Sequence, residues 1–404
     1  MNANLILYSR RFALFADHQI SLGDQVNSRE RILTALDHRE PDRVPIDIGS
    51  CGPTAIHVNA YTSLLAHLGI TEKIELWDVV GQLAQPSERV LEMLGADVRG
   101  IRVGGPKNGT KIISDDTLID PWGITWFRTE GATCYNIREY PLRHATQQDL
   151  ATYPFPDGKD PHRVLGLAER AQQLREQTNY AILGEISGHI LERAQMVRGF
   201  DTFLEDLVVR PAFADELMDR ILAIECDIAA TLLDAVGAYL DVFAFKDDIG
   251  MQAGPLISPK MFRARIKPRL QKLIEVIKSK TRAKIWFHSC GSVYYAVRDL
   301  IEIGVDILNP VQVAAKDMDT ARLKREFGNN IAFWGAFDTQ NVLPFGSTQD
   351  VEIEVKTRLR DLAPGGGYVL ASVHNIEADV SGENVWAMAQ AAQRWGKYPL
   401  QITE

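Results

Sequence analysis

Apolar and polar positions divide most of the chain into two kinds of segment that follow one another in turn. Short apolar runs rich in β-branched residues alternate with longer segments in which apolar residues recur at helical spacing. A repeated order of strand and helix is typical of a parallel sheet whose two faces are covered by helices. The predicted core strands are residues 180–185, 240–245, 283–288, 305–309, 331–334 and 368–371, and the helices between them include 211–236, 259–280, 292–303 and 348–362.

The first predicted element begins after residue 26. Asn27 and Ser28 precede an amphipathic run at 29–36, which is the pattern of a capped helix, and a turn then leads to a short strand at 44–48. About eight strand–helix units over roughly 370 residues favour an α/β fold closed into a (β/α)8 TIM barrel over an open sheet. We therefore expect an N-terminal extension at 1–26, a single barrel domain at 27–398 and a tail at 399–404.

Two stretches do not follow the strand–helix order. Residues 111–140 contain the run from Asp120 to Trp126, whose alternation resembles a hairpin, so a small antiparallel insertion in the barrel is expected here. Residues 364–367, Pro-Gly-Gly-Gly, precede a strand and lack the lysine of a phosphate-binding loop. They are predicted to form a turn at the bottom of the barrel.

Composition limits the classes of protein to which the chain could belong. Its 404 residues are 46% hydrophobic and 24% charged, with a net charge of −9 and no basic stripe, which argues against a nucleic-acid partner. No apolar run reaches the roughly 18 residues of a membrane span, and the N-terminus lacks the apolar core of a secretory signal. The four cysteines are sparse and irregularly spaced, so we expect no disulfide framework and a cytoplasmic location.

Two predicted strands end in residues that could bind a metal ion. Functional groups of an α/β barrel lie just past the carboxyl ends of its strands, and His288 and Cys290 follow one strand while His374 follows another. Residues two apart in extended chain point the same way, so His288 and Cys290 could share one zinc ion. Together with His374 they would leave a fourth position open, as in catalytic zinc sites. The alternative is a strand-end histidine, a small buried cysteine and a loop histidine.

Carboxylates follow two further strands. Asp247 and Asp248 come after the strand at 240–245, and Glu185 ends the strand at 180–185. Adjacent residues point in opposite directions if the strand continues, so one of the two aspartates is expected to face the mouth. There it could contact substrate, hold a ligating imidazole or complete a metal shell, and Glu185 could act as a general acid or a fourth ligand. These three are the predicted catalytic residues; the alternatives are a helix cap, a solvated turn and a paired structural carboxylate.

Polar residues also close two strands near the C-terminal half of the barrel. Asn309 and Gln312 follow the strand at 305–309, and Asp338 follows the strand at 331–334. They are predicted to line the mouth and to orient a substrate.

From about residue 28 onward, the chain resembles uroporphyrinogen-decarboxylase-like proteins. The resemblance rests on four stretches and covers nearly all of the chain beyond the N-terminal extension. These stretches are residues 29–45 (Arg-Glu-Arg through Glu-Pro-Asp-Arg-Val-Pro), 288–291 (His-Ser-Cys-Gly), 303–306 (Ile-Gly-Val-Asp) and 333–335 (Phe-Trp-Gly).

The resemblance implies one of two chemistries. Decarboxylases of this superfamily use no metal and bind a tetrapyrrole through an arginine-rich N-terminal loop, whereas residues 49–53 here, Gly-Ser-Cys-Gly-Pro, have no such cluster. The other branch contains corrinoid-dependent methyltransferases, such as the methylcobalamin:coenzyme M enzymes, which bind zinc through His-x-Cys and a distant cysteine. His288 and Cys290 match the first two ligands, and His374 stands where the third would be a cysteine.

The expected function is therefore zinc-dependent methyl transfer. A methyl group would move between a small methylated or methoxylated compound, or another acceptor, and a corrinoid (cobalamin). No corrinoid-binding domain is recognised in the chain, so the resemblance implies that a partner protein carries it, and related barrels imply a homodimer. The alternatives are a metal-independent decarboxylase-type lyase and a non-catalytic ligand-binding barrel. The sequence names neither the methyl donor nor the acceptor, nor the direction of transfer.

Overall fold

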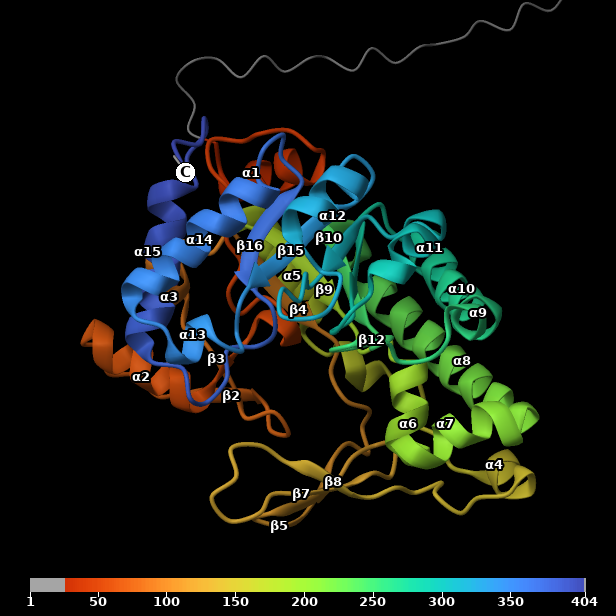
Figure 1. The fold of residues 1–404 in the computed structure, drawn as a ribbon. Helices are drawn as coiled ribbons and strands as arrows, with labels where there is room; N and C mark the ends of the chain where they lie inside the picture. Colours follow the sequence, from red (N-terminus) through yellow and green to blue (C-terminus); the bar gives the residue numbers. More distant parts are fainter. Residues whose placement is uncertain (1–25, 403–404) are drawn as a thin grey trace, which may run out of the picture.

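The centre of the computed structural model, which describes residues 26–402, is a curled parallel sheet (Figure 1). Seven strands are hydrogen-bonded in the order β16-β15-β14-β13-β10-β9-β4. Each is short and nearly all of its residues are buried, as expected when helices cover the outside and side chains fill the inside. The strands are β4 (Val98–Arg102), β9 (Ala181–Glu185), β10 (Val242–Lys246), β13 (Lys284–His288), β14 (Ile307–Asn309), β15 (Ala332–Phe337) and β16 (Tyr368–Ser372).

The segment predicted as the first strand closes this sheet. Ile46 forms a parallel bridge to Leu370 of β16, and the Asp47 N–H donates to the Leu370 carbonyl at 2.9 Å. On the other side, the Asp97 N–H donates to the Ile46 carbonyl at 2.8 Å, next to the start of β4. Residues 44–48 thus lie between β16 and β4 and add an eighth strand position to the seven. The predicted (β/α)8 barrel is confirmed.

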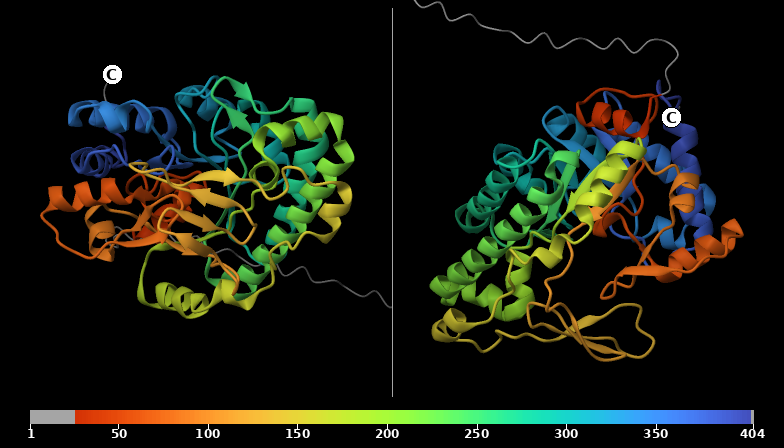
Figure 2. Two further views of the ribbon diagram at one scale, coloured as in Figure 1. Left: turned by 90° about the horizontal axis from the view of Figure 1, so that it is seen from below. Right: turned by 180° about the vertical axis from the view of Figure 1, so that it is seen from behind.

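Helices surround the sheet on its outer side, as the views in Figure 2 show. The predicted helices at 211–236 and 348–362 match the structure, and the segment predicted at 259–280 is helical from 259 to 278 with a π-helical turn at Phe262–Ile266. Pro268 has no N–H to donate to the preceding turn, and the chain there forms a π-turn in which the Lys267 N–H reaches the Phe262 carbonyl. The helices around the barrel include α5 (Leu167–Gln177), α8 (Pro211–Val236), α10 (Lys267–Lys278), α11 (Val297–Glu302), α12 (Thr320–Phe327), α14 (Thr348–Leu362) and α15 (Gly382–Trp395).

The inside of the barrel is filled by two tryptophans and small or branched side chains. Trp286 and Trp334 are almost fully buried and pack with Val98, Leu183 and Val242 in one cluster. The helix α1 (Ser28–Leu36), predicted from its cap, adds Ile32 and Leu36 to the same cluster and therefore covers one end of the barrel. The barrel is a packed core with a single usable mouth at the carboxyl ends of its strands.

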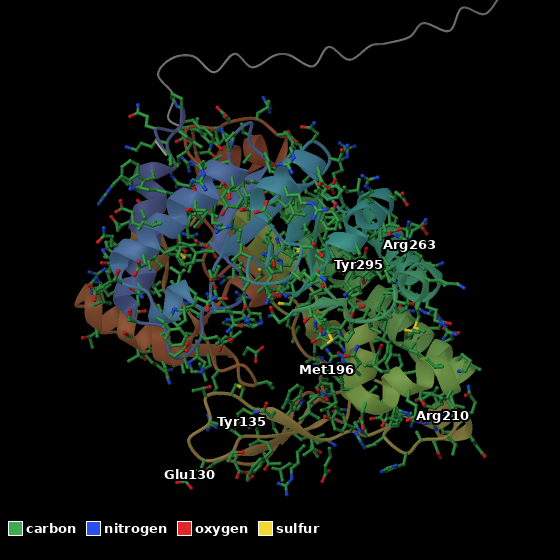
Figure 3. The ribbon with its side chains drawn as sticks, viewed as in Figure 1. Glu130, Tyr135, Met196, Arg210, Arg263 and Tyr295 are labelled. Atoms are coloured by element: carbon green, nitrogen blue, oxygen red, sulfur yellow. The ribbon has the colours of Figure 1, made fainter. Side chains whose placement is uncertain are left out.

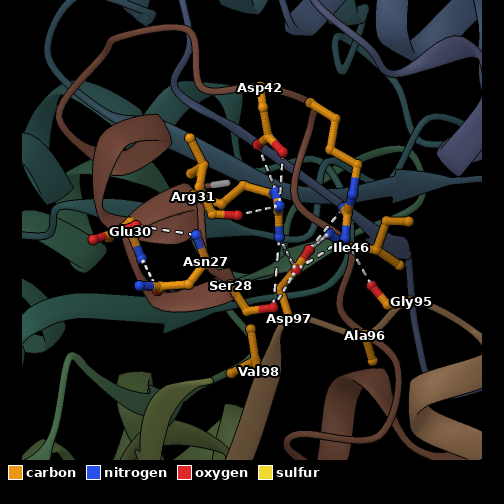
Figure 4. A network of polar contacts seen from close by, with 12 residues as sticks. Asn27, Ser28, Glu30, Arg31, Asp42, Ile46, Gly95, Ala96, Asp97 and Val98 are labelled. Atoms are coloured by element: carbon orange, nitrogen blue, oxygen red, sulfur yellow. Dashed lines mark hydrogen bonds and ion pairs between the residues drawn. The ribbon is translucent and has the colours of Figure 1, made fainter. Parts of the chain in front are cut away.

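A buried aspartate holds α1 against this end of the barrel (Figure 4). Asp97 is fully buried, and its carboxylate accepts hydrogen bonds from the Ser28 hydroxyl at 2.8 Å and the Arg31 guanidinium at 2.7 Å. Arg43 donates to it at 2.8 Å and the Ile46 N–H at 2.9 Å. The arginines of the family-like opening stretch therefore tie the first helix and first strand to the start of β4, a structural role.

The predicted insertion is a four-stranded antiparallel sheet in the order β5-β6-β7-β8. It is anchored next to the barrel mouth, because the Tyr135 N–H donates to the Val80 carbonyl at 3.0 Å and the His57 Nε2 lies 2.9 Å from the Thr133 carbonyl. Seen from below, this sheet lies in front of the barrel (Figure 2, left). Its strands are β5 (Lys111–Ser114), β6 (Thr117–Ile119), β7 (Thr125–Phe127) and β8 (Asn136–Glu139).

Within residues 26–402, the helices are all too short or too polar to cross a membrane.

The Asp97 network makes a prediction about stability. Asp97→Asn removes the charge shared by Arg31 and Arg43 and leaves the buried Arg31 with only its more exposed counter-ion, Asp42. Loss of one partner of a buried ion pair costs about 3–5 kcal/mol, so urea denaturation should show the free energy of unfolding lowered by that amount. As a matched control, Asp201→Asn breaks an exposed pair with Arg143 and should leave the unfolding free energy unchanged. Equal effects at the two positions would contradict this role for Asp97.

Candidate metal centre

The pairing register of the parallel strands places three polar side chains at one level of the barrel mouth. Lys246 of β10 is paired with His288 of β13, and His288 is paired with Asn309 of β14. Each residue ends its strand, and side chains of paired residues on neighbouring parallel strands point to the same face. The candidate site is built on this row.

Three ligand atoms converge beside the row. One atom each from Asp248, His288 and Cys290 lies within 4.8 Å of the others. The His288 Nε2 is 3.5 Å from the Cys290 Sγ. A tetrahedral zinc ion, with bonds of about 2.05 Å to nitrogen and about 2.3 Å to sulfur, would set these atoms about 3.6 Å apart. A hydrogen bond from an un-ionised thiol would give a similar distance, so a measurement of metal content has to separate the two states.

The environment of His288 determines which nitrogen of its imidazole ring carries the proton and which has a free lone pair. Its Nδ1 is 2.5 Å from the Asn309 Oδ1, while the Asn309 Nδ2 donates to the Trp334 carbonyl at 2.8 Å. Because that carbonyl can only accept, the amide is oriented with its oxygen toward His288, and the imidazole carries its proton on Nδ1. Burial lowers the pKa of His288 to about 3. The ring is neutral, with the Nε2 lone pair on the Cys290 side, which is how metal-binding histidines are held.

The two acidic groups of the site are buried beside one another. Burial is the largest cause that raises the pKa of Cys290 and of Asp248, and the Asp248 charge raises the pKa of Cys290 further. The Cys290 N–H donates to an Asp248 oxygen at 2.8 Å, which fixes the carboxylate. A divalent cation would favour the ionised form of both groups, and the nitrogen, sulfur and oxygen donors suit zinc. The donor set therefore fits the predicted metal.

His374 lies at the same mouth but outside the group of three. Its ring centroid is 6.4 Å from that of His288, and its side chain is 46% exposed. The His374 Nδ1 faces the Glu377 carboxylate at 3.3 Å. That His374 binds the metal stays a prediction, and Asp248 takes the place beside His288 and Cys290 in this structure.

The other two predicted catalytic carboxylates are engaged elsewhere. Asp247 is fully buried and accepts hydrogen bonds from the Leu191 and Glu192 N–H groups at 2.9 and 2.8 Å, so it caps the start of helix α6 (Leu191–Arg198). Asp247 and Asp248 thus point in different directions, as expected of adjacent residues. The Glu185 carboxylate accepts from the Gly52 N–H at 3.0 Å and forms ion pairs with other residues at the mouth.

The three predicted substrate-binding residues have different surroundings. Asn309 supports His288, as described above. The Gln312 Oε1 accepts from the Gly291 N–H at 2.5 Å and thereby holds the loop after Cys290. Asp338 caps its own turn, accepting from the Gln340 N–H at 2.7 Å and the Asn341 N–H at 3.1 Å. None of these contacts tests substrate binding, which stays a prediction for all three.

Two cavities meet at the candidate centre. The first, of about 230 Å3, we call the lysine chamber, and the second, of about 500 Å3, we call the glutamine groove. The lysine chamber is lined by His288, Asp248, Lys246, His189, Glu192 and Met196, among others, and the glutamine groove by Cys290, Gln252, Gln312 and Gln340; His374 lines both. A larger groove of about 610 Å3, between β4 and α5, contains none of the three grouped residues.

The lysine chamber contains residues that sequence reasoning left out of its candidate set. Burial and the nearby Asp248 raise the pKa of Glu192 to about 7, and burial keeps the pKa of His189 well below its usual value. Lys246 ends β10 and is paired with His288, but this pairing depends on a strand register that the sequence alone does not reveal. Met196, another lining residue, lies on the side of the barrel that carries Tyr135 of the insertion (Figure 3).

Comparison with known proteins shows the family. The model of the family described as Uroporphyrinogen decarboxylase (URO-D) matches residues 136–395, more than half of the chain. The protein belongs to this family. A search of curated proteins finds no match to the sequence.

A solved structure confirms the fold. A methyltransferase from Methanosarcina mazei is similar over 92% of this chain and 99% of its own, with 20% identity and a TM-score of 0.62. A B12-independent methionine synthase from Shewanella sp. W3-18-1, in complex with selenomethionine, is similar over 56% of this chain and 67% of its own, with 12% identity and a TM-score of 0.38.

The contact between Asn309 and His288 makes a prediction about metal affinity. Asn309→Ala removes the acceptor that keeps the proton on Nδ1, and loss of such a supporting partner typically weakens metal binding 10–100-fold. Competition of zinc-loaded protein with a chromophoric chelator should show a loss in that range, with the stoichiometry kept at saturating zinc. Asp338→Asn, whose side chain serves its own turn, should leave the zinc affinity unchanged. An Asn309→Ala protein with unaltered zinc affinity would refute the supporting role.

Proposed function

We propose that this protein is a zinc-dependent methyltransferase. It moves a methyl group between a small methylated or methoxylated compound, or another acceptor, and a corrinoid carried by a partner protein. The observation that carries the proposal is the convergence of Asp248, His288 and Cys290, with 3.5 Å between nitrogen and sulfur, at the mouth of a URO-D family barrel. The fold shared with a methyltransferase from Methanosarcina mazei supports it.

The residues of the centre have separate tasks in this proposal. His288, Cys290 and Asp248 hold the ion, and the two negative charges of the thiolate and the carboxylate balance the two positive charges of the cation. Zinc supplies Lewis acidity, which lowers the pKa of a substrate thiol or hydroxyl and makes it a nucleophile at neutral pH. Asn309 keeps the His288 proton on Nδ1, away from the ion. Gln312 holds the loop that carries Cys290 through its bond to the Gly291 N–H.

The two cavities give the two reactants separate approaches to the centre. The lysine chamber, of about 230 Å3, is below the usual size of a site for a drug-sized ligand, so it suits a small substrate. The glutamine groove, of about 500 Å3, borders Cys290 and is the side on which the corrinoid of a partner would present its methyl group. For transfer from the corrinoid, that group would supply the methyl carbon and would keep the electron pair of the bond that is lost. The new bond then joins the methyl carbon to the substrate sulfur or oxygen, whose proton is released.

Decarboxylation of a tetrapyrrole is a poorer fit to the same mouth. A substrate with many carboxylates needs several free cations. At this mouth, Arg102 is engaged by the Glu185 carboxylate at 3.4 Å, while Lys246, at 3.7 Å from the same carboxylate, supplies one cation rather than several. Arg102 is further bound to the Gly49 carbonyl at 2.6 Å. We therefore favour methyl transfer over the lyase.

The direct test is a methyl-transfer assay with free corrinoids, because methylcob(III)alamin and cob(I)alamin differ in absorbance. Zinc-loaded protein should interconvert them when given a panel of small thiols or methoxylated acids. Cys290→Ala and Asp248→Ala should each lower the rate about a hundredfold or more, since each weakens the hold on the Lewis acid. Cys226→Ala, on the outer helix α8, is the matched control and should keep the wild-type rate. Full activity in the Cys290→Ala protein would overturn the proposal.

A further inference from the structure

The ammonium group of Lys246 is held in the lysine chamber without a hydrogen-bond acceptor. Its nearest carboxylate oxygen, the Glu185 Oε1, is 3.7 Å from Nζ, which is beyond hydrogen-bond distance. Among residues 26–402, no acceptor bonds to this Nζ. Glu185 is itself shared, because it also pairs with Arg102 at 3.4 Å and accepts from the Gly52 N–H. One carboxylate thus serves two cations, and the N–H groups of Lys246 are available to a ligand.

His189 offers a second unused polar group in the same chamber. The residue is 7% exposed, and neither ring nitrogen makes a hydrogen bond in the described part of the chain, although its Nε2 lies 3.3 Å from the Glu192 Oε2. Buried polar groups are normally paired, so an orphaned imidazole beside a cavity indicates a missing partner. Burial and the charge of Lys246 keep the pKa of His189 low, which leaves a neutral ring with one N–H to donate. Lys246 and His189 therefore present donors to the same space.

The chain keeps the space around Lys246 open. A Cβ at Gly52 would lie 3.1 Å from the Lys246 Nζ and 3.1 Å from the Glu185 Oε1. Any side chain here would press on the ammonium group. The lining also contains three acids, Asp78, Glu192 and Asp248, so the chamber is not uniformly cationic. Asp78 is engaged by the Gly81 N–H at 2.8 Å, and burial beside Asp248 raises the pKa of Glu192 to about 7.

We propose that the lysine chamber binds a small aliphatic carboxylate, whose anionic group is held by Lys246 and His189 while its other end faces His288 and Asp248. The assignment of this ligand as the methyl donor or acceptor rests on the proposed function. The binding preference itself rests only on the chamber. The lysine chamber selects against cationic compounds of the same size, because an ammonium group would face Lys246. It also selects against large aromatic compounds, because the volume of the cavity is about 230 Å3.

The test compares three probes of nearly equal size and different charge. Methoxyacetate, 2-methoxyacetamide and 2-methoxyethylamine are titrated calorimetrically into zinc-loaded protein and into protein stripped of metal. Methoxyacetate should bind at least about tenfold more tightly than the amide, as expected for a hydrogen bond to a charged group, and the amine should bind most weakly. Lys246→Met should abolish the preference for the acid, and Lys246→Arg should retain part of it. Lys260→Met, which removes an exposed lysine on the outer surface, should bind as the wild type does.

The outcomes separate this inference from the proposed function. Zinc content and melting temperature of Lys246→Met are measured first, and Gly52→Ala, which crowds Nζ without removing its charge, provides a second route to the same loss. Equal binding of acid and amide, tighter binding of the amine, no measurable binding of methoxyacetate, or an unchanged preference in Lys246→Met would overturn the inference. Cys290→Ala should lose methyl transfer but keep the preference for the acid. A preference that persists in a protein without methyl-transfer activity toward any corrinoid would sink the proposed function alone.

Discussion

Parallel pairing of β10, β13 and β14 is the constraint on which the candidate centre depends. Register sets Lys246, His288 and Asn309 side by side, and one residue of slip would turn each of these side chains to the other face. The buried tryptophans Trp286 and Trp334 fill the inside of the barrel, packed with side chains from neighbouring strands. The row of polar groups is therefore positioned by the pairing of the strands and by the packing beneath it.

Residues of the same type have different roles in the centre because they have different hydrogen-bond partners. Asp247 and Asp248 are adjacent in the chain, yet one caps α6 and the other lies against Cys290. His288 is oriented by Asn309, whereas His189, in the same chamber, makes no hydrogen bond in the described structure and lies 3.3 Å from the Glu192 carboxylate. A residue's type alone therefore says little about its task here; its partners do. His288 and Asp248 of the centre also line the lysine chamber, so a ligand bound by Lys246 would contact the metal ligands directly.

Much of this arrangement could be predicted from sequence periodicity. The order of strands and helices predicted the barrel, and the period of two in extended chain predicted that the His288 and Cys290 side chains point the same way. Contacts between strands far apart in the sequence were not predictable in this way. That Asn309 would support His288, that Asp338 would cap its own turn, and that Lys246 would stand beside His288 all depend on register. The π-helical turn within the predicted helix at 259–280 lies just before Pro268, a local signal that was present in the sequence.

The coordination shell of bound zinc tests the central claim most directly. X-ray absorption at the zinc edge, measured on protein purified without chelators, reports the number of sulfur neighbours and their distance. We predict one zinc ion per chain with one sulfur at about 2.3 Å, the remaining neighbours being nitrogen or oxygen at about 2.0–2.2 Å. Cys290→Ser should convert this shell to nitrogen and oxygen only. Protein that contains no zinc, or whose zinc has no sulfur neighbour in the wild type, would contradict the account.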